Sequence, residues 1–213
     1  MRRGRPVFPE AWVEWEVRSP DGRVVDRGRK RSQTFVGNAL ALLYTIIASW
    51  LTTTSAYAGN TVSGIIDTGG TARVVALGTG ASVYLGGKAP EGDTTAGIVA
   101  GKGTAPVTIG DYKLADPIPH GSGAGQLYYY ATVVSTLARG DTEWYFTIQR
   151  NMENRGSPSI TVYEVGLFVR LGMLLVSPYW YSAMLARDLI PGGISIPQYY
   201  VLQVRYLLRH RVG

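Results

Sequence analysis

The segment Ser159 to Val169, with the sequence SITVYEVGLFV, decides the fold because β-branched and aromatic residues occupy both of its faces. Such a short and almost uninterrupted apolar run predicts a strand that is buried on both sides. Gly166 within it predicts a bulge or a close approach of another backbone segment. Residues 184–196 (MLARDLIPGGISI) and 199–208 (YYVLQVRYLL) follow as further strands, so the last third of the chain predicts a β scaffold.

Glu164 is the one charged residue inside the first of these strands. A buried carboxylate without a partner is strongly destabilising, so Glu164 must either meet a cation or lie at an interface. Arg170 and Arg187 are the candidate partners in the sequence. We predict a structural ion pair between Glu164 and Arg187.

The region before this block has the same β texture. Residues 127–137 (LYYYATVVSTL) and 143–150 (EWYFTIQR) are rich in aromatic and β-branched residues, which predicts two strands. Arg139-Gly140-Asp141 is suited to the hairpin loop between them.

A second hairpin is predicted near the N-terminus. Residues 11–17 alternate between apolar and polar side chains, which is the period of a half-buried strand. Ser19-Pro20-Asp21-Gly22 follows at once and combines residues that favour a turn. We therefore predict that residues 11–28 form a hairpin.

The run from Phe35 to Leu51 (FVGNALALLYTIIASWL) has no charge and a helical period. We predict a helix over residues 38–51, with Asn38 or Thr34 as its N-cap. Because this helix is apolar on all sides, it is expected to be buried between a sheet and another layer or subunit. The length of the run also leaves a membrane segment open, although its polar and glycine residues favour the buried helix.

Residues 52–126 are dominated by Gly, Thr, Ser, Ala and Pro. Three apolar pieces predict short strands on long loops, namely Val62 to Ile66, Arg73 to Leu77 and Gly97 to Ala100. Ala81 to Ala96 contains little that anchors it, so we expect it to be ordered only by neighbouring molecules.

Composition restricts the chemistry of the 213-residue chain. It has no cysteine, which excludes disulfides, thiolate metal sites and cysteine nucleophiles, and its hydrophobic content of 46% is ample for a core. The net charge is +6, with basic residues clustered at both termini and near residues 27–31. We interpret the clusters as solvated termini and strand edges, where Lys and Arg discourage unwanted strand pairing. Contact of the basic termini with nucleic acid stays open.

No pattern in the sequence matches an arrangement of catalytic residues. Gly101-Lys102-Gly103-Thr104 lacks the spacing and the following helix of a phosphate-binding loop. Neither paired carboxylates for glycoside hydrolysis nor a G-x-S-x-G nucleophile is indicated. We therefore expect no enzymatic activity, no metal, no cofactor and no small-molecule substrate.

The order of several short motifs resembles that in virion structural proteins of tailed bacteriophages and archaeal viruses. These motifs are the helix that begins near Asn38 after a basic strand, Gly101 to Pro106 with Asp111 to Leu114, Glu164 to Phe168, and Leu185 to Asp188 followed by Gly192 to Ile196. The resemblance spans residues 30–208. Ala81 to Ala96 and Gly172 to Ser182 have no counterpart in the pattern.

The resemblance implies a non-enzymatic subunit of a virion, in the tail, baseplate, fibre or a capsid-decorating position. The implied partners are copies of itself and other virion proteins, with no membrane. The implied fold is mainly β, a jelly-roll-like antiparallel β-sandwich with one buried N-terminal helix and long glycine-rich loops. Residues 1–33 would form an arm and hairpin, and residues 34–213 a single domain whose β-rich core covers residues 127–208.

Gly172 to Ser182 (GMLLVSPYWYS) is unusually apolar for a loop, and exposed apolar loops mark contact sites. We predict that five of its side chains bind a neighbouring subunit. They are Leu174, Leu175, Tyr179, Trp180 and Tyr181.

Two other function classes remain open. The tyrosine and tryptophan clusters also fit a carbohydrate- or surface-binding β module, because aromatic rings can stack on sugars. The run from Phe35 to Leu51 also fits a membrane-anchored surface protein.

Overall fold

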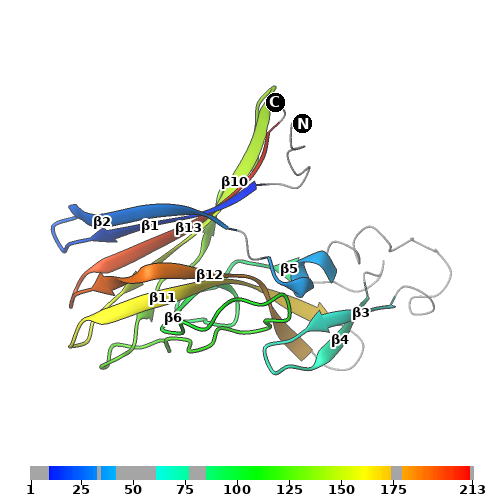
Figure 1. The fold of residues 1–213 in the computed structure, drawn as a ribbon, viewed down its shortest axis with the longest axis horizontal. Helices are drawn as coiled ribbons and strands as arrows, with labels where there is room; N and C mark the ends of the chain where they lie inside the picture. The colour runs from blue at the N-terminus through cyan, green and yellow to red at the C-terminus, as the bar shows by residue number, and fades with distance from the viewer. Residues whose placement is uncertain (1–9, 33–34, 42–60, 77–84, 174–178, 212–213) are drawn as a thin grey trace.

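The computed structural model describes residues 10–32, 35–41, 61–76, 85–173 and 179–211 (Figure 1). Within them the chain folds mainly as antiparallel strands, which confirms the predicted β class. The strands are β1 (Glu10–Arg18), β2 (Val24–Ser32), β3 (Thr61–Ile66), β4 (Ala72–Ala76), β5 (Leu85–Gly86), β6 (Gly97–Gly101), β7 (Tyr128–Tyr129), β8 (Val133–Val134), β9 (Ala138–Arg139), β10 (Glu143–Glu153), β11 (Ile160–Met173), β12 (Tyr179–Ile196) and β13 (Val201–Arg211).

The first sheet has the strand order β2-β1-β13-β10, and the short strands β7, β8 and β9 pair with the far edge of β10. β1 and β2 form the predicted hairpin, and Gly22 in its turn has a φ of 83°, a conformation that favours glycine. Gly28 lies opposite Trp15, and a Cβ at this position would overlap the indole ring. The hairpin therefore needs glycine both in its turn and beneath this tryptophan.

The second sheet is built on β11, which pairs with β12 on one side and with β5 and β6 on the other. In Figure 1, β11 and β12 run below the first sheet, and β3 and β4 form a separate two-stranded ribbon. Gly172 pairs with Trp180 and Met173 with Tyr179, so both ends of the predicted loop Gly172 to Ser182 belong to strands. The short predicted strands around residues 62–66, 73–77 and 97–100 are present as β3, β4 and β6.

The two sheets contribute to one hydrophobic core. Side chains alternate along β1 and β13 as predicted, with Val13 and Val17 of β1 and Leu202, Val204 and Tyr206 of β13 buried. Residues of β6, β11 and β12 belong to the same cluster, among them Ile98, Val165, Leu167, Met184 and Ala186. Burial of apolar surface between the sheets is therefore the main favourable term that holds them together.

The N-terminal helix is described only at residues 37–41, and the remainder of the predicted span lies outside the described residues. The prediction of Asn38 as an N-cap is wrong. Its side-chain amide donates to the carbonyl of Ile66 and accepts from the N–H of Ile66, both at 2.7 Å, and donates to the carbonyl of Met184 at 3.2 Å. It thus joins the end of β3 to the interior of β12 instead of capping the helix. Leu40 is 62% exposed, so this first turn is not buried on all sides as predicted.

The predicted strand over residues 127–137 is divided into the two short strands β7 and β8, and β9 follows it. Between β7 and β8 the chain leaves the edge of β10, and the N–H of Thr132 donates to the carbonyl of Ala89 at 2.8 Å. The carbonyl of Ala89, in the glycine-rich part of the chain before β7, thus replaces a partner on β10 for the N–H of Thr132.

Arg150 of β10 anchors that glycine-rich segment from inside the chain. Its side chain is 1% exposed and donates to the carbonyls of Tyr130 at 2.7 Å, Asp93 at 2.6 Å and Ile98 at 3.1 Å. Weaker bonds of 3.3 Å reach the carbonyls of Pro90 and Ala96. The expectation that this part of the chain is ordered only by neighbouring molecules is therefore wrong for its described residues.

Arg150→Lys should lower the free energy of unfolding by roughly 2 kcal/mol or more, because lysine has fewer donors and leaves buried carbonyls without a partner. Chemical denaturation measures this change. Arg23→Lys, in the exposed turn after β1, is the control and should stay within about 0.5 kcal/mol of wild type. Equal stability of Arg150→Lys and wild type would contradict the anchoring role.

Candidate interaction surface

The predicted subunit interface lies at the far end of the β11–β12 hairpin. It comprises Leu174, Leu175, Tyr179, Trp180 and Tyr181. The first two residues lie outside the described residues, and for the next two the structure describes only the backbone, which pairs with β11. The ring of Tyr181 is half-buried and lies 3.9 Å from the guanidinium of Arg73 on β4. This contact is within the chain, so the subunit interface stays a prediction.

Glu164 and Arg187 are brought together as the sequence predicts. Glu164 is fully buried on β11, and Arg187 Nε donates to its Oε2 at 2.7 Å. Arg187 also donates to Asp111 Oδ2 at 2.8 Å and to the carbonyl of Ala105 at 3.0 Å. The ion pair therefore ties β11 and β12 to the loop that follows β6.

The same carboxylate accepts three main-chain hydrogen bonds from this loop. The N–H groups of Gly103 and Asp116 donate to Oε1 at 3.1 and 2.9 Å, and that of Ala115 donates to Oε2 at 3.2 Å. A Cβ on Gly103 would overlap Glu164 Oε1, and one on Gly101 would lie 2.6 Å from it. The two glycines thus let the backbone approach a buried carboxylate.

The charges in this cluster support one another. Burial acts to raise the pKa of Asp111, but hydrogen bonds from Arg187 and Thr108 outweigh it and hold the pKa below its usual value of 3.8. Burial acts to lower the pKa of Arg187, and the carboxylates of Asp111 and Glu164 raise it overall. With Glu164 at 0% and Arg187 at 2% exposure, the central ion pair is buried, and its role is to hold the fold.

The surface with the strongest case for binding a partner is the free end of β10. We use the name β10 tip for residues 137–145 together with His210 of β13. The ends of β10 and β13 extend beyond the second sheet (Figure 1). Three of the nine exposed large hydrophobic residues of the described chain lie in the tip, namely Leu137, Trp144 and Tyr145.

Trp144 continues the core-facing side of β10 past the end of the core. Along this side Ile148 is buried and Phe146 is half-buried, whereas Trp144 is 50% exposed. Trp144 pairs with Arg139 of β9 and with His210 of β13, and the guanidinium of Arg139 lies 5.2 Å from its ring centre. Half of the indole surface therefore remains in contact with water.

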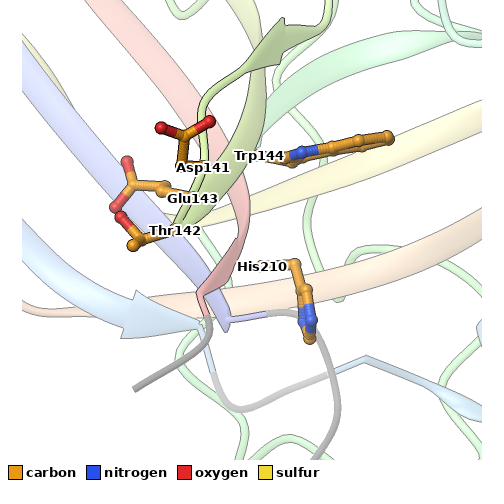
Figure 2. A pocket seen from close by; sticks show the side chains of 5 residues that line it. All are labelled: Asp141, Thr142, Glu143, Trp144 and His210. Carbon is orange, nitrogen blue, oxygen red and sulfur yellow. The ribbon is translucent and has the colours of Figure 1, made fainter.

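A pocket of about 300 Å³ lies at the tip. It is lined by Asp141, Thr142, Glu143, Trp144 and His210. In Figure 2 the carboxylates of Asp141 and Glu143 point to one side of the hairpin, and Trp144 and His210 lie on the other. The acidic groups and the aromatic ring therefore do not converge on a common point.

The opposite face of the tip is charged. Arg209 donates to Glu10 Oε2 at 2.9 Å and approaches Glu143 to 3.6 Å. The hydrogen bond from Arg209 holds the pKa of Glu10 below its usual value, although burial acts slightly against it. Tyr145 lies opposite Arg209 and is 41% exposed. On this face an exposed aromatic ring lies beside paired charges, a combination found in protein contact surfaces.

The sequence did not reveal the tip as a surface. Alternation placed Trp144 on the same face as Phe146 and Ile148, and this assignment is correct. How far the second sheet extends below that face depends on the tertiary structure, which a local pattern does not encode. The available signal was Trp144, a tryptophan three residues after the predicted hairpin loop Arg139-Gly140-Asp141.

The described part of the chain contains no group of three or more metal-ligating side chains that could hold an ion. It also contains no helix that is long and apolar enough to cross a membrane. No protein-family model, curated protein or solved structure matches the chain.

Gly103→Ala should lower the free energy of unfolding by about 1–3 kcal/mol, because the added methyl group must displace Glu164 or Ala115. Thermal or chemical unfolding measures it. Gly110→Ala in the same loop is the matched control, since the nearest atom to its Cβ is 4.0 Å away. Similar losses in both variants would show that the approach to Glu164 is not the cause.

Asp111→Asn should reduce stability at neutral pH by roughly 1–3 kcal/mol, because a charged hydrogen bond to Arg187 is weakened. The folded pKa of Asp111 lies below 3.8, so its stabilisation is fully present above that pH and is lost as the pH falls through the folded value. The difference between variant and wild type should therefore shrink below about pH 3.8 in denaturation curves. Asp141→Asn at the exposed tip is the control and should show no such trend. A difference independent of pH would contradict this account.

Proposed function

We propose that this protein is a structural subunit of a virus particle of the tailed type, which acts through contacts between subunits. The proposed architecture is a jelly-roll-like β-sandwich formed by the two antiparallel sheets around their common core. Its place would be the tail, the baseplate, a fibre or an accessory position on the capsid. The order of sequence motifs described above supports this class.

The exposed β10 tip is the observation that carries an assembly function. Trp144 and Tyr145 expose aromatic rings on the two opposite faces of an extension that lies beyond the second sheet in the described part of the chain. Burial of aromatic side chains supplies much of the energy of protein interfaces, and tryptophan and tyrosine are enriched among the residues that dominate binding. A second protein surface is therefore the partner that this extension fits.

The geometry of the tip favours this function over sugar binding. A sugar site needs polar groups that converge beside an aromatic ring, so that they orient the ligand stacked on it. The carboxylates of Asp141 and Glu143 point away from the side on which Trp144 lies (Figure 2). A flat protein contact needs no such convergence, because its polar groups lie at the rim.

Trp144→Ala should weaken self-association by at least about tenfold, because it removes the central aromatic surface of the tip. Sedimentation velocity over a concentration series measures the association constant. Tyr199→Ala, which removes a ring that is 56% exposed but lies in the turn before β13, is the control and should associate like wild type. A wild-type chain that stays monomeric at all concentrations would contradict assembly through copies of itself.

A further inference from the structure

β2 is an edge strand of the first sheet within the described part of the chain. It pairs with β1 over its whole length, and no other strand in the described part of the chain pairs with it. Six of its nine residues are exposed, including Val24 and Val25. An edge of this kind presents a row of main-chain N–H and C=O groups that can pair with another chain.

The outer face of the first sheet has its charges arranged in columns, one strand each. β13 contributes a basic column, β1 an acidic one and β2 a second basic one. The columns consist of Arg205 and Arg209, then Glu10, Glu14 and Glu16, then Arg27, Arg29 and Arg31. Opposite charges therefore alternate from strand to strand across the sheet.

Distances confirm that the columns interact. Glu14 lies between Arg29, at 3.1 Å, and Arg205, at 3.4 Å. Glu10 likewise lies between Arg209, at 2.9 Å, and Arg31, at 3.8 Å. Each glutamate of β1 in these two rows thus has a cation on both sides, and opposite charges across strands stabilise a sheet.

Arg29 and Arg31 of β2 have such a partner on the β1 side only, in the described part of the chain. The side chains of Arg29 and Arg31 remain 45% and 42% exposed. No carboxylate in the described part of the chain lies within ion-pair distance of Arg27. A strand added beside β2 would continue the alternation of basic and acidic columns if its outward-facing side chains were acidic.

A second copy of this strand does not fit the edge. Pairing of β2 with β2 of another copy would place two arginine columns side by side, and like charges directly opposite each other are destabilising. The acidic strand of the chain itself is β1, which already has partners on both edges. The partner that can pair with the free edge of β2 is therefore a segment of a different protein.

We infer that β2 binds an extended acidic segment of another protein as an added strand. Main-chain hydrogen bonds along the free edge supply affinity, and Asp or Glu at every second residue faces Arg27, Arg29 and Arg31. The residues between the acids would face Asp26, Gly28 and Lys30 on the inner side, so small or polar side chains fit there. This inference goes beyond the proposed function, since it depends only on the edge of the first sheet.

The test uses a labelled nine-residue peptide that alternates Glu and Thr, which matches the length of β2. Its control has the same composition with the glutamates grouped at one end. Fluorescence anisotropy with the full chain should give a dissociation constant at least about tenfold lower for the alternating peptide. Hydrogen exchange should show new protection of amides within residues 24–32 when it binds.

Matched protein variants test the charge pairing. The triple variant Arg27→Glu, Arg29→Glu, Arg31→Glu should lose the alternating peptide and gain binding of a Lys-Thr alternating peptide. The control reverses three exposed lysines elsewhere, Lys88→Glu, Lys102→Glu and Lys113→Glu, which changes the net charge equally and should retain the first peptide. Circular dichroism verifies that each variant is folded.

Two results would overturn the inference. The first is equal binding of the alternating and grouped peptides to wild type, which needs no variant. The second is tighter binding of a single-stranded oligonucleotide without protection of the β2 amides, which would make the edge a general polyanion surface.

Discussion

The glycine-rich segment before β7, described over residues 85–126, has few apolar side chains. The hydrogen bonding of its main chain therefore determines whether this part of the domain is ordered. Buried backbone groups need partners. Two charged side chains supply them from the sheets. Arg150 of β10 donates to the carbonyls of residues 90–98, and Glu164 of β11 accepts from the N–H groups of Gly103, Ala115 and Asp116. One guanidinium thus satisfies several carbonyls of the segment and one carboxylate several of its N–H groups.

This arrangement explains which parts of the sequence could be interpreted and which could not. The strands were predictable because alternation and β-branched composition report directly on burial, as in residues 11–17 and 199–208. The contact of Glu164 with Arg187 was predictable because a charge in an apolar strand requires compensation. Arg150 could not be recognised, since it ends a strand pattern and its partners are carbonyl oxygens, which every residue has. Asn38 resembled a helix cap in the sequence, because its actual partner, the backbone of Ile66, also leaves no signal in a sequence pattern.

The two surfaces that remain open lie at opposite edges of the first sheet. The β10 tip adjoins β9 at one edge, and β2 forms the other edge, with β1 and β13 between them. Their chemistry differs, because the tip exposes aromatic rings and the β2 edge exposes arginines. Contacts at two unlike edges do not close on themselves as a two-fold pair would. A subunit of this form can therefore bind one kind of neighbour on each side.

The basic residues of β2 have two physical consequences, and the same side chains produce both. Arginine on an edge strand prevents the strand from pairing with its own copy, which protects a sheet from uncontrolled growth. The same charge favours a partner whose side chains have the opposite sign, so that exclusion of one neighbour and selection of another come from one set of residues. Within the chain, Glu10 and Glu14 lie 3.8 and 3.1 Å from Arg31 and Arg29, so an added acidic strand would share these arginines with β1. The charge pattern of the first sheet thus continues to its edge in a form that an acidic strand can complete.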